Sequence, residues 1–249
     1  MDGKQVPTIF SPQRMRLAER RAHSRQLAGG TTWLSELIGH DVLERLGFLR
    51  CQPGSALVLG DRAGTLSPAL EANGADVTAP TEIDLEQPLA LGTFDLIVSL
   101  LDLGTVNDLP GALIQLRLAL NPGGLLIAAL VGAGSLPLVR SAMMTSDGER
   151  PAARIHPQVD DRAASALMQR AGFARQVVDR YTITARYDGL ANLVSDLRDQ
   201  GLGSVLADRA PTLSRRQYQL ARQAFASHAD ESGRIPESFE VVTMTGWKS

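Results

Sequence analysis

The chain has 249 residues, of which 44% are apolar and 4% aromatic, so it can bury a sizeable core built mainly from aliphatic side chains. Its net charge of -2 excludes the basic surplus typical of proteins that wrap nucleic acid, and its longest apolar run, residues 125–134, is too short for a membrane span. Cys51 is the single cysteine, no Cys/His spacing is typical of a metal site, and no secretory segment is recognised. We therefore expect a cytoplasmic protein with no nucleic-acid partner, no metal and no transmembrane segment.

The first fifty residues read as helical. Residues 13–27 form a helix-compatible stretch that is dense in arginine, Thr31 and Thr32 are placed to cap a second helix, and residues 41–49 are amphipathic at helical spacing. We interpret residues 1–50 as an N-terminal helical cap. The basic face of its first helix is either a solvated surface or a dock for an acidic protein partner or an anionic membrane surface. Its arginines are Arg14, Arg16, Arg20, Arg21 and Arg25.

The pattern changes after residue 50. Apolar residues 56–59 are followed by the loop GDRAG at residues 60–64 and by a helix-like stretch, which is how a nucleotide-binding strand-helix-strand unit begins. Gly60 would allow a tight turn, and Gly64 would let a cofactor approach the backbone beside the next helix. A plain strand-to-helix turn explains the same residues.

The region that follows is unusually short. The strand expected at residues 75–78 runs into Ala79 and Pro80 with no acid at its end, where such folds place one to bind ribose hydroxyls. The residues left before Phe94 are too few for a full helix, a further strand and a return loop. We therefore expect that one helix has been lost or reduced to a turn.

Strands and helices alternate through the rest of the chain, which predicts an α/β fold with a mainly parallel sheet covered on both faces. The remaining strands are expected at residues 94–100, 125–130, 173–178 and 239–247, and the helices at residues 107–120, 160–171, 187–197 and 214–226, with a turn at residues 121–124. Residues 188–234 read as a helical insertion within a domain that runs from residue 51 to residue 249. Asp102 and Asn107 belong either to a substrate-facing loop or, as we favour, to an ordinary strand exit and turn.

Residues 94–124, FDLIVSLLDLGTVNDLPGALIQLRLALNPGG, resemble the methyltransferase-like family of the mitochondrial complex I assembly factor that hydroxylates an arginine, together with its bacterial relatives. The malonyl-acyl-carrier-protein methyltransferases of biotin synthesis are more distant cousins. Similar stretches at residues 9–23, 167–187, 196–209 and 233–248 extend the resemblance over nearly the whole chain. It implies a Rossmann-like class I methyltransferase fold, shortened between strand 2 and strand 4, and S-adenosylmethionine (SAM) as cofactor.

The resemblance also implies a cofactor site, although no catalytic residue. Carried over by position, the site consists of Gly60, Asp61, Arg62 and Gly64 in the loop, Asp84 and Leu85 on the adenine side, and Ser99 and Leu100 at the exit of the fourth strand. Family members read D-L-G-C-G-x-G where this chain has VLGDRAG. In the other interpretation, Asp84 is simply a loop acid or a helix cap.

These residues predict a SAM-dependent methyltransferase-family protein with an unknown acceptor and an incomplete cofactor motif. One alternative is a non-catalytic methyltransferase-fold protein that assembles or binds other proteins, as the resemblance to the complex I assembly factor implies. Another is a carboxyl methyltransferase acting on an acyl-carrier protein, whose acidic surface would meet the basic first helix. Arginine hydroxylation is implied by the resemblance alone. The shortened region before Phe94 distinguishes the first two possibilities.

Overall fold

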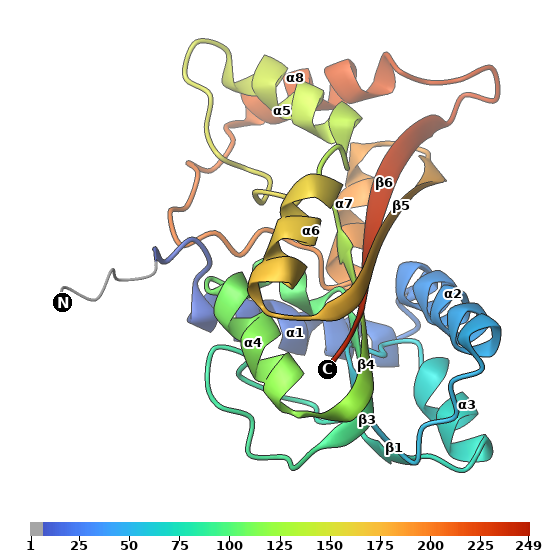
Figure 1. Cartoon of the computed structure of the whole chain (residues 1–249). Coiled ribbons are helices and arrows are strands. Elements are labelled where there is room, and N and C mark those ends of the chain that lie inside the picture. Colours follow the sequence, from blue (N-terminus) through green and yellow to red (C-terminus); the bar gives the residue numbers. More distant parts are fainter. Residues whose placement is uncertain (1–6) are drawn as a thin grey trace, which may run out of the picture.

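The structure is a computed structural model that describes residues 7–249 (Figure 1). Its helices are α1 (Pro12–Leu27), α2 (Trp33–Leu49), α3 (Leu66–Ala72), α4 (Leu109–Leu118), α5 (Pro137–Asp147), α6 (Asp161–Arg170), α7 (Leu190–Asp199) and α8 (Arg215–Ala226), with a short 3-10 turn, η1 (Asp102–Thr105). Its strands are β1 (Ser55–Leu59), β2 (Asp76–Thr78), β3 (Phe94–Leu100), β4 (Leu120–Val131), β5 (Ala174–Tyr187) and β6 (Ile235–Trp247).

The strands form one sheet in the order β2-β1-β3-β4-β6-β5. The first four strands of this order run parallel, and β6 is antiparallel to both of its neighbours. Short apolar runs such as β3 suit this arrangement, because strands at the centre of a parallel sheet are buried on both faces. The predicted α/β fold with a mainly parallel sheet is therefore confirmed.

Two apolar cores cover the two faces of the sheet. Successive residues of β1 alternate between them: Ala56 and Val58 join the core beneath α2, α3 and α7, whereas Leu57 and Leu59 join the core beneath α4 and α6. Figure 1 shows the same layers, with α4 and α6 on one side of the sheet and α2 and α3 on the other. The carboxyl ends of β1 and β3 lie at the edge of this sandwich, where open α/β sheets bind ligands.

The connection between β2 and β3 is as short as the sequence predicts. Residues 79–93 contain neither a helix nor a strand, and β2 itself has only three residues. Leu85, in the middle of this connection, is buried in the core beneath α4. The expected loss of a helix is confirmed.

Several element boundaries differ from the predictions. The two segments expected after Thr32 are one continuous helix, α2, and the predicted turn at residues 121–124 is an irregularity inside β4, where the register with β3 shifts. β5 continues to Tyr187, so the helix predicted from residue 187 begins only at Leu190. Helix α5 has no counterpart among the predicted elements.

Helices α7 and α8 lie between β5 and β6 in the chain, within the predicted insertion at residues 188–234. α8 lies beside α5 at the end of the molecule farthest from α3 (Figure 1). The division of the chain into a cap of residues 1–50 and a domain from residue 51 stays a prediction.

Candidate functional site

The loop after β1 makes a very close contact with the end of β3. Gly60 has a φ of +75°, and a Cβ atom there would lie 2.1 Å from the carbonyl oxygen of Leu100 and 2.8 Å from Oδ2 of Asp102. Gly64 also has a positive φ, +64°, but a Cβ atom there would meet nothing within 4 Å. Gly60 therefore serves the contact between two strand ends, and Gly64 serves the turn of the loop.

Asp61 caps the helix that follows the loop. Its carboxylate accepts hydrogen bonds from the backbone N–H groups of Thr65 (3.0 Å), Leu66 (3.0 Å) and Ser67 (2.8 Å), and from the Ser67 hydroxyl (3.0 Å). These are the unpaired amides at the start of α3. The negative charge of Asp61 is thus used within the chain, as a helix cap.

Arg62 reaches across to the end of β3. Its Nη2 donates to Oδ1 of Asp102 at 2.7 Å, and its Nη1 donates to the carbonyl oxygen of Leu100 at 3.4 Å. Gly201 packs against the Arg62 side chain. A Cβ atom at Gly201 would lie 3.4 Å from Nε of Arg62 and 3.6 Å from Cβ of Ala22. The sequence interpretation of Asp102 as an ordinary strand exit misses this ion pair.

Helix α1 lies over this group of charges. Burial and then the negative charge of Asp102 raise the pKa of Glu19 on α1, and the positive charge of Arg62 acts in the opposite direction. The buried Ala22 of the same helix faces the Arg62 side. The loop after β1 is therefore covered by a helix whose Glu19 and Ala22 lie 43 and 40 positions before Arg62 in the sequence.

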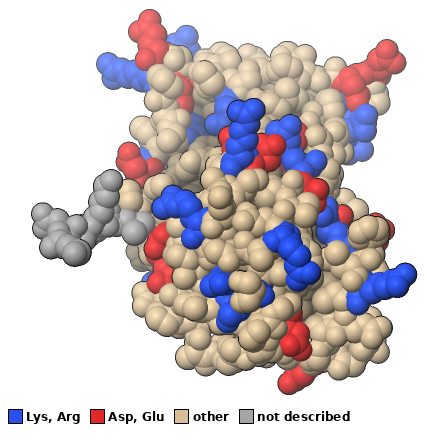
Figure 2. All heavy atoms as spheres, viewed as in Figure 1, with Lys and Arg blue, Asp and Glu red and all other residues tan. Residues whose placement is uncertain are grey.

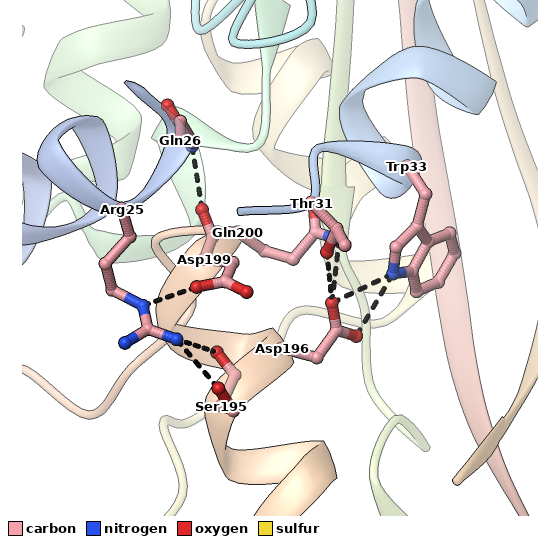
Figure 3. A network of polar contacts seen from close by, with 8 residues as sticks. All are labelled: Arg25, Gln26, Thr31, Trp33, Ser195, Asp196, Asp199 and Gln200. Carbon is pink, nitrogen blue, oxygen red and sulfur yellow. Dashed lines mark hydrogen bonds and ion pairs between the residues drawn. The ribbon is translucent and has the colours of Figure 1, made fainter. Parts of the chain in front are cut away.

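A polar network fixes α1 and α2 to α7 (Figure 3). Arg25 pairs with Asp199 and donates to the hydroxyl of Ser195 at 2.7 Å. Asp196, the residue after Ser195, accepts from the indole N–H of Trp33 at 3.0 Å. Gln26, Thr31 and Gln200 complete the network. Because these contacts join α7 to helices far from it in the chain, with Trp33 and Asp196 163 positions apart, they hold α1 in place over the loop.

Asn107 holds the segment that precedes α1. Its side-chain oxygen accepts from the backbone N–H groups of Ile9 and Phe10, each at 2.8 Å, and its Nδ2 donates to the carbonyl of Phe10 at 3.2 Å. The sequence favours an ordinary turn at Asn107. The structure shows instead a contact across 97 positions of the chain, which no local pattern could reveal.

Of the four other residues predicted for the site, Ser99 and Leu100 lie beside the loop at the end of β3, where Ser99 pairs with Leu59, whereas Asp84 and Leu85 lie in the connection between β2 and β3. Asp84 is exposed and accepts from the backbone N–H of Glu86 at 3.0 Å, as a loop acid does, and Leu85 is buried in the core. Ser99 and Leu100 are fully buried in β3, and the Ser99 hydroxyl has no partner among residues 7–249. Only the backbone of Leu100 meets the loop. That these residues contact a cofactor stays a prediction.

The basic face predicted for the first helix is smaller than its five arginines suggest. Arg14 donates to the carbonyl oxygens of Ser204 and Leu206, and Arg25 belongs to the network of Figure 3. Both therefore serve contacts inside the chain. The arginines that stay exposed are Arg16, Arg20 and Arg21. On the face of the molecule seen in Figure 2, basic and acidic side chains are interspersed.

A surface depression of about 500 Å³ lies beside α7 and is lined by Trp33, Tyr187 and Asp196, among others; its lining includes none of residues 60–64. Within residues 7–249, no cluster of three or more His, Cys, Asp or Glu side chains is arranged to hold a metal ion. In the same part of the chain, none of the helices combines the length and the apolar character needed to cross a membrane.

As folded here, the loop does not fit SAM, the cofactor that the resemblance implies. Aligned letter by letter, Arg62 takes the position of the second glycine in D-L-G-C-G-x-G, and its side chain fills the space at the end of β3. Asp61 occupies the amides of α3, and no acid ends β2. The loop groups that would bind the amino-acid end of SAM are thus engaged within the chain. The acid that would bind the ribose of SAM is missing.

Comparisons with known proteins agree with this scaffold. No family model matches the chain. The chain is 33% identical over 165 residues to the mitochondrial arginine-hydroxylase NDUFAF5 of Mus musculus, an alignment that covers 65% of this chain and 48% of that protein. It is 32% identical over 166 residues to the malonyl-[acyl-carrier protein] O-methyltransferase of Laribacter hongkongensis, covering 66% of this chain and 55% of that protein. The chain thus spans about half the length of these curated relatives.

Solved structures share the fold. A candidate methyltransferase from Bacillus halodurans superposes with a TM-score of 0.51 at 13% identity, covering 83% of this chain and 98% of that one. At this level of identity the likeness concerns the fold. The chain therefore has the fold of the class I SAM-dependent methyltransferases, and it is a relative of NDUFAF5 and of the malonyl-[acyl-carrier protein] O-methyltransferases.

Proposed function

We propose that this methyltransferase-family protein works by binding or helping to assemble another protein and does not transfer methyl groups from SAM. The observation that carries the proposal is the connection between β2 and β3. Its residues 79–93 form no helix or strand, and β2 ends without an acid. An acid at this position is what binds the ribose hydroxyls in dinucleotide-binding folds of this type. Without it, the ribose hydroxyls of SAM lack the acid that such folds use to bind them.

The rest of the connection supports the same conclusion. Leu85 is used in the apolar core beneath α4, and the carboxylate of Asp84 caps its own loop. Because Leu85 is anchored in this core, the middle of the connection cannot move away to admit a nucleoside without exposing an apolar side chain. The rest of the scaffold is retained, with an apolar core on each face of a six-stranded sheet. When the contacts to a cofactor are missing and the scaffold is kept, the protein surface is the part that remains available for a function.

The surface that suits a protein partner is the outward face of α1. Arg16, Arg20 and Arg21 are exposed there, together with Leu17 and Leu27. Exposed arginines beside apolar side chains favour a partner with an acidic surface. The name of the Laribacter hongkongensis relative points to an acyl-carrier protein, and the resemblance to the complex I assembly family points to a respiratory subunit.

The test is calorimetric titration with SAM and with S-adenosylhomocysteine (SAH). We expect no binding at millimolar ligand, and micromolar affinity for either compound would overturn the proposal. Arg62→Gly, which restores the glycine of the family motif, is the matched variant. It should also fail to bind, because the adenosine contacts are still missing. If Arg62→Gly binds SAH while the natural chain does not, the short connection between β2 and β3 does not prevent binding, and Arg62 alone closes the site.

Binding by the natural chain would favour the second candidate function, methyl transfer. This candidate is supported by the positive φ angles of Gly60 and Gly64, which preserve the course of a nucleotide-binding loop. The acceptor would then be sought first among acyl-carrier proteins, the substrate named for the Laribacter hongkongensis relative. Arginine-containing proteins are the next class of acceptor to examine, because 65% of this chain aligns with a protein named as an arginine-hydroxylase.

A further inference from the structure

The end of β3 presents two hydrogen-bond acceptors where ligands of open α/β sheets bind. One is the carbonyl oxygen of Leu100, the last residue of the strand, and the other is the carboxylate of Asp102 in η1. Both lie against Gly60 of the neighbouring strand end. A carboxylate and a carbonyl oxygen that converge in this way form a receptor for a cationic hydrogen-bond donor.

In this chain the cation comes from the protein itself. The guanidinium of Arg62 binds Asp102 at 2.7 Å and Leu100 at 3.4 Å, and the two charged side chains are only 20% and 23% exposed. Gly201, just after α7, lies against the guanidinium, and Ala22 of α1 packs against the other side of this glycine's position. Such an enclosed pair is screened less by solvent than a pair on the open surface.

Arg62 does not need to be there to shape the loop. The positive φ angles of the loop belong to Gly60 and Gly64, and Arg62 has none. An alanine could therefore adopt the backbone conformation of residue 62 without strain. What Arg62 adds is its side chain, which places a positive charge on the two acceptors.

We infer that Arg62 is an internal ligand, whose guanidinium occupies the receptor at the end of β3 that would otherwise take the ammonium group of a bound amino-acid-type ligand. SAM and SAH carry such an ammonium group at their methionine end. The inference rests on the proposed function, since it explains how the loop remains closed and stable without a cofactor. Removing the guanidinium should expose an empty receptor for small cations of the guanidinium or ammonium class.

The first experiment is a double-mutant cycle with Arg62→Ala, Asp102→Asn and the double variant, followed by thermal unfolding. Each single variant should lower the Tm by about 3 °C, and the double variant by little more than either one, because both remove the same pair. The matched control is the exposed pair Arg20 and Glu82, which are 3.8 Å apart and 72% and 65% exposed. The control cycle should show additive effects close to zero.

The second experiment is chemical rescue. Millimolar methylguanidinium should raise the Tm of Arg62→Ala and leave Arg20→Ala and the natural chain unchanged. Arg62→Lys, which keeps the charge on an unbranched side chain, should retain part of the stability and respond less to the compound. Coupling no larger than in the control cycle, or equal rescue of all variants, would overturn the inference.

These outcomes are separate from the test of the proposed function. SAH binding to the natural chain would contradict the proposed function whatever the cycle shows. Additive effects at Arg62 and Asp102 would contradict the internal ligand even if the natural chain binds no SAH. Should Arg62→Ala fail to fold, the cycle can be run with Arg62→Lys and Asp102→Asn.

Discussion

At the scale of single residues, the two glycines of the loop after β1 have different structural reasons to be glycine. Both have positive φ angles, at which any side chain is strained. Only Gly60 is also in contact with another strand end, so close that a Cβ atom would overlap the carbonyl oxygen of Leu100. Gly64 is thus constrained by its backbone conformation alone, whereas Gly60 is constrained by its conformation and by the contact with β3.

Replacing each glycine by alanine should separate these two effects. Gly64→Ala should lower the free energy of unfolding by about 1 kcal/mol, which is the conformational penalty alone. Gly60→Ala should lower it by about 3 kcal/mol or more, because β1 and β3 must also move apart. Urea unfolding followed by circular dichroism measures both. Equal losses for the two variants would mean that the contact between the strand ends is not as tight as the structure shows.

The sequence identifies the two glycines but not the partners of their neighbours. A glycine after a short apolar run is a local pattern, and it correctly indicates a turn at Gly60. The ion pair of Arg62 with Asp102 joins residues 40 positions apart, and the contact of Asn107 with Phe10 joins residues 97 apart. Which distant side chains meet depends on how the strand ends are placed in the sheet, and no pattern within a window of a few residues contains that information.

At the scale of elements, the segment before α1 is held by a histidine as well as by Asn107. The ring of His156 packs edge-on against Phe10 at 5.2 Å, and its Nε2 accepts from the backbone N–H of Val205 at 2.8 Å. Burial and then the positive charge of Arg14 lower the pKa of His156 to about 4. The folded chain therefore keeps this histidine neutral in a pH range where the unfolded chain protonates it.

This difference predicts a loss of stability in mild acid. The unfolded chain binds more protons than the folded chain between the ordinary histidine pKa of 6.5 and about 4, so the stabilising effect is present above this range and is lost as the pH falls through it. From about pH 7.5 to about pH 5, the natural chain should lose about 2 kcal/mol more of its unfolding free energy than His156→Gln does. Glutamine keeps an acceptor for the Val205 N–H and does not titrate in this range.

Urea unfolding at the two pH values measures the effect, and the exposed His40, replaced in the same way, is the control. A loss of the same size in His156→Gln as in the natural chain would show that other groups cause the acid sensitivity. Asp95 and Asp147 have lowered pKa values, so their contributions are lost at lower pH and occur in both proteins.

Elements with a strong local pattern are the ones that the sequence predicts well. β3 is mainly apolar over its seven residues, as a strand buried on both faces requires, and its predicted and observed bounds agree. β5 is an edge strand whose residues alternate between exposed and partly buried, with polar side chains throughout, so only its first residues stand out as a strand. α5 is missing from the predictions although its buried residues Val139, Ala142 and Ser146 recur at helical spacing, and the contact with α8 that stabilises it is not visible in the sequence.

At the scale of the whole molecule, the sheet is unevenly supported. β3 is paired on both edges and covered by a core on each face, with most of its residues buried. β2 forms the outer edge with three residues, none of them buried, and the connection of residues 79–93 that follows it has no strand or helix of its own. The shortening of the fold has therefore removed support on the side where adenosine would bind.

Amide hydrogen exchange should show this asymmetry directly. Amides of β3 and β4 should exchange only through global unfolding, whereas those of residues 79–93 should exchange orders of magnitude faster, because the connection has few backbone hydrogen bonds and exposed side chains. Adding millimolar SAH should leave both rates unchanged if no nucleoside binds. Slow exchange in residues 79–93 without ligand would contradict the structure of the connection, and slowing on addition of SAH would mean that the connection folds around a nucleoside. The same measurement thus reports on the architecture and on the proposed loss of cofactor binding, with the exchange of β3 as an internal standard.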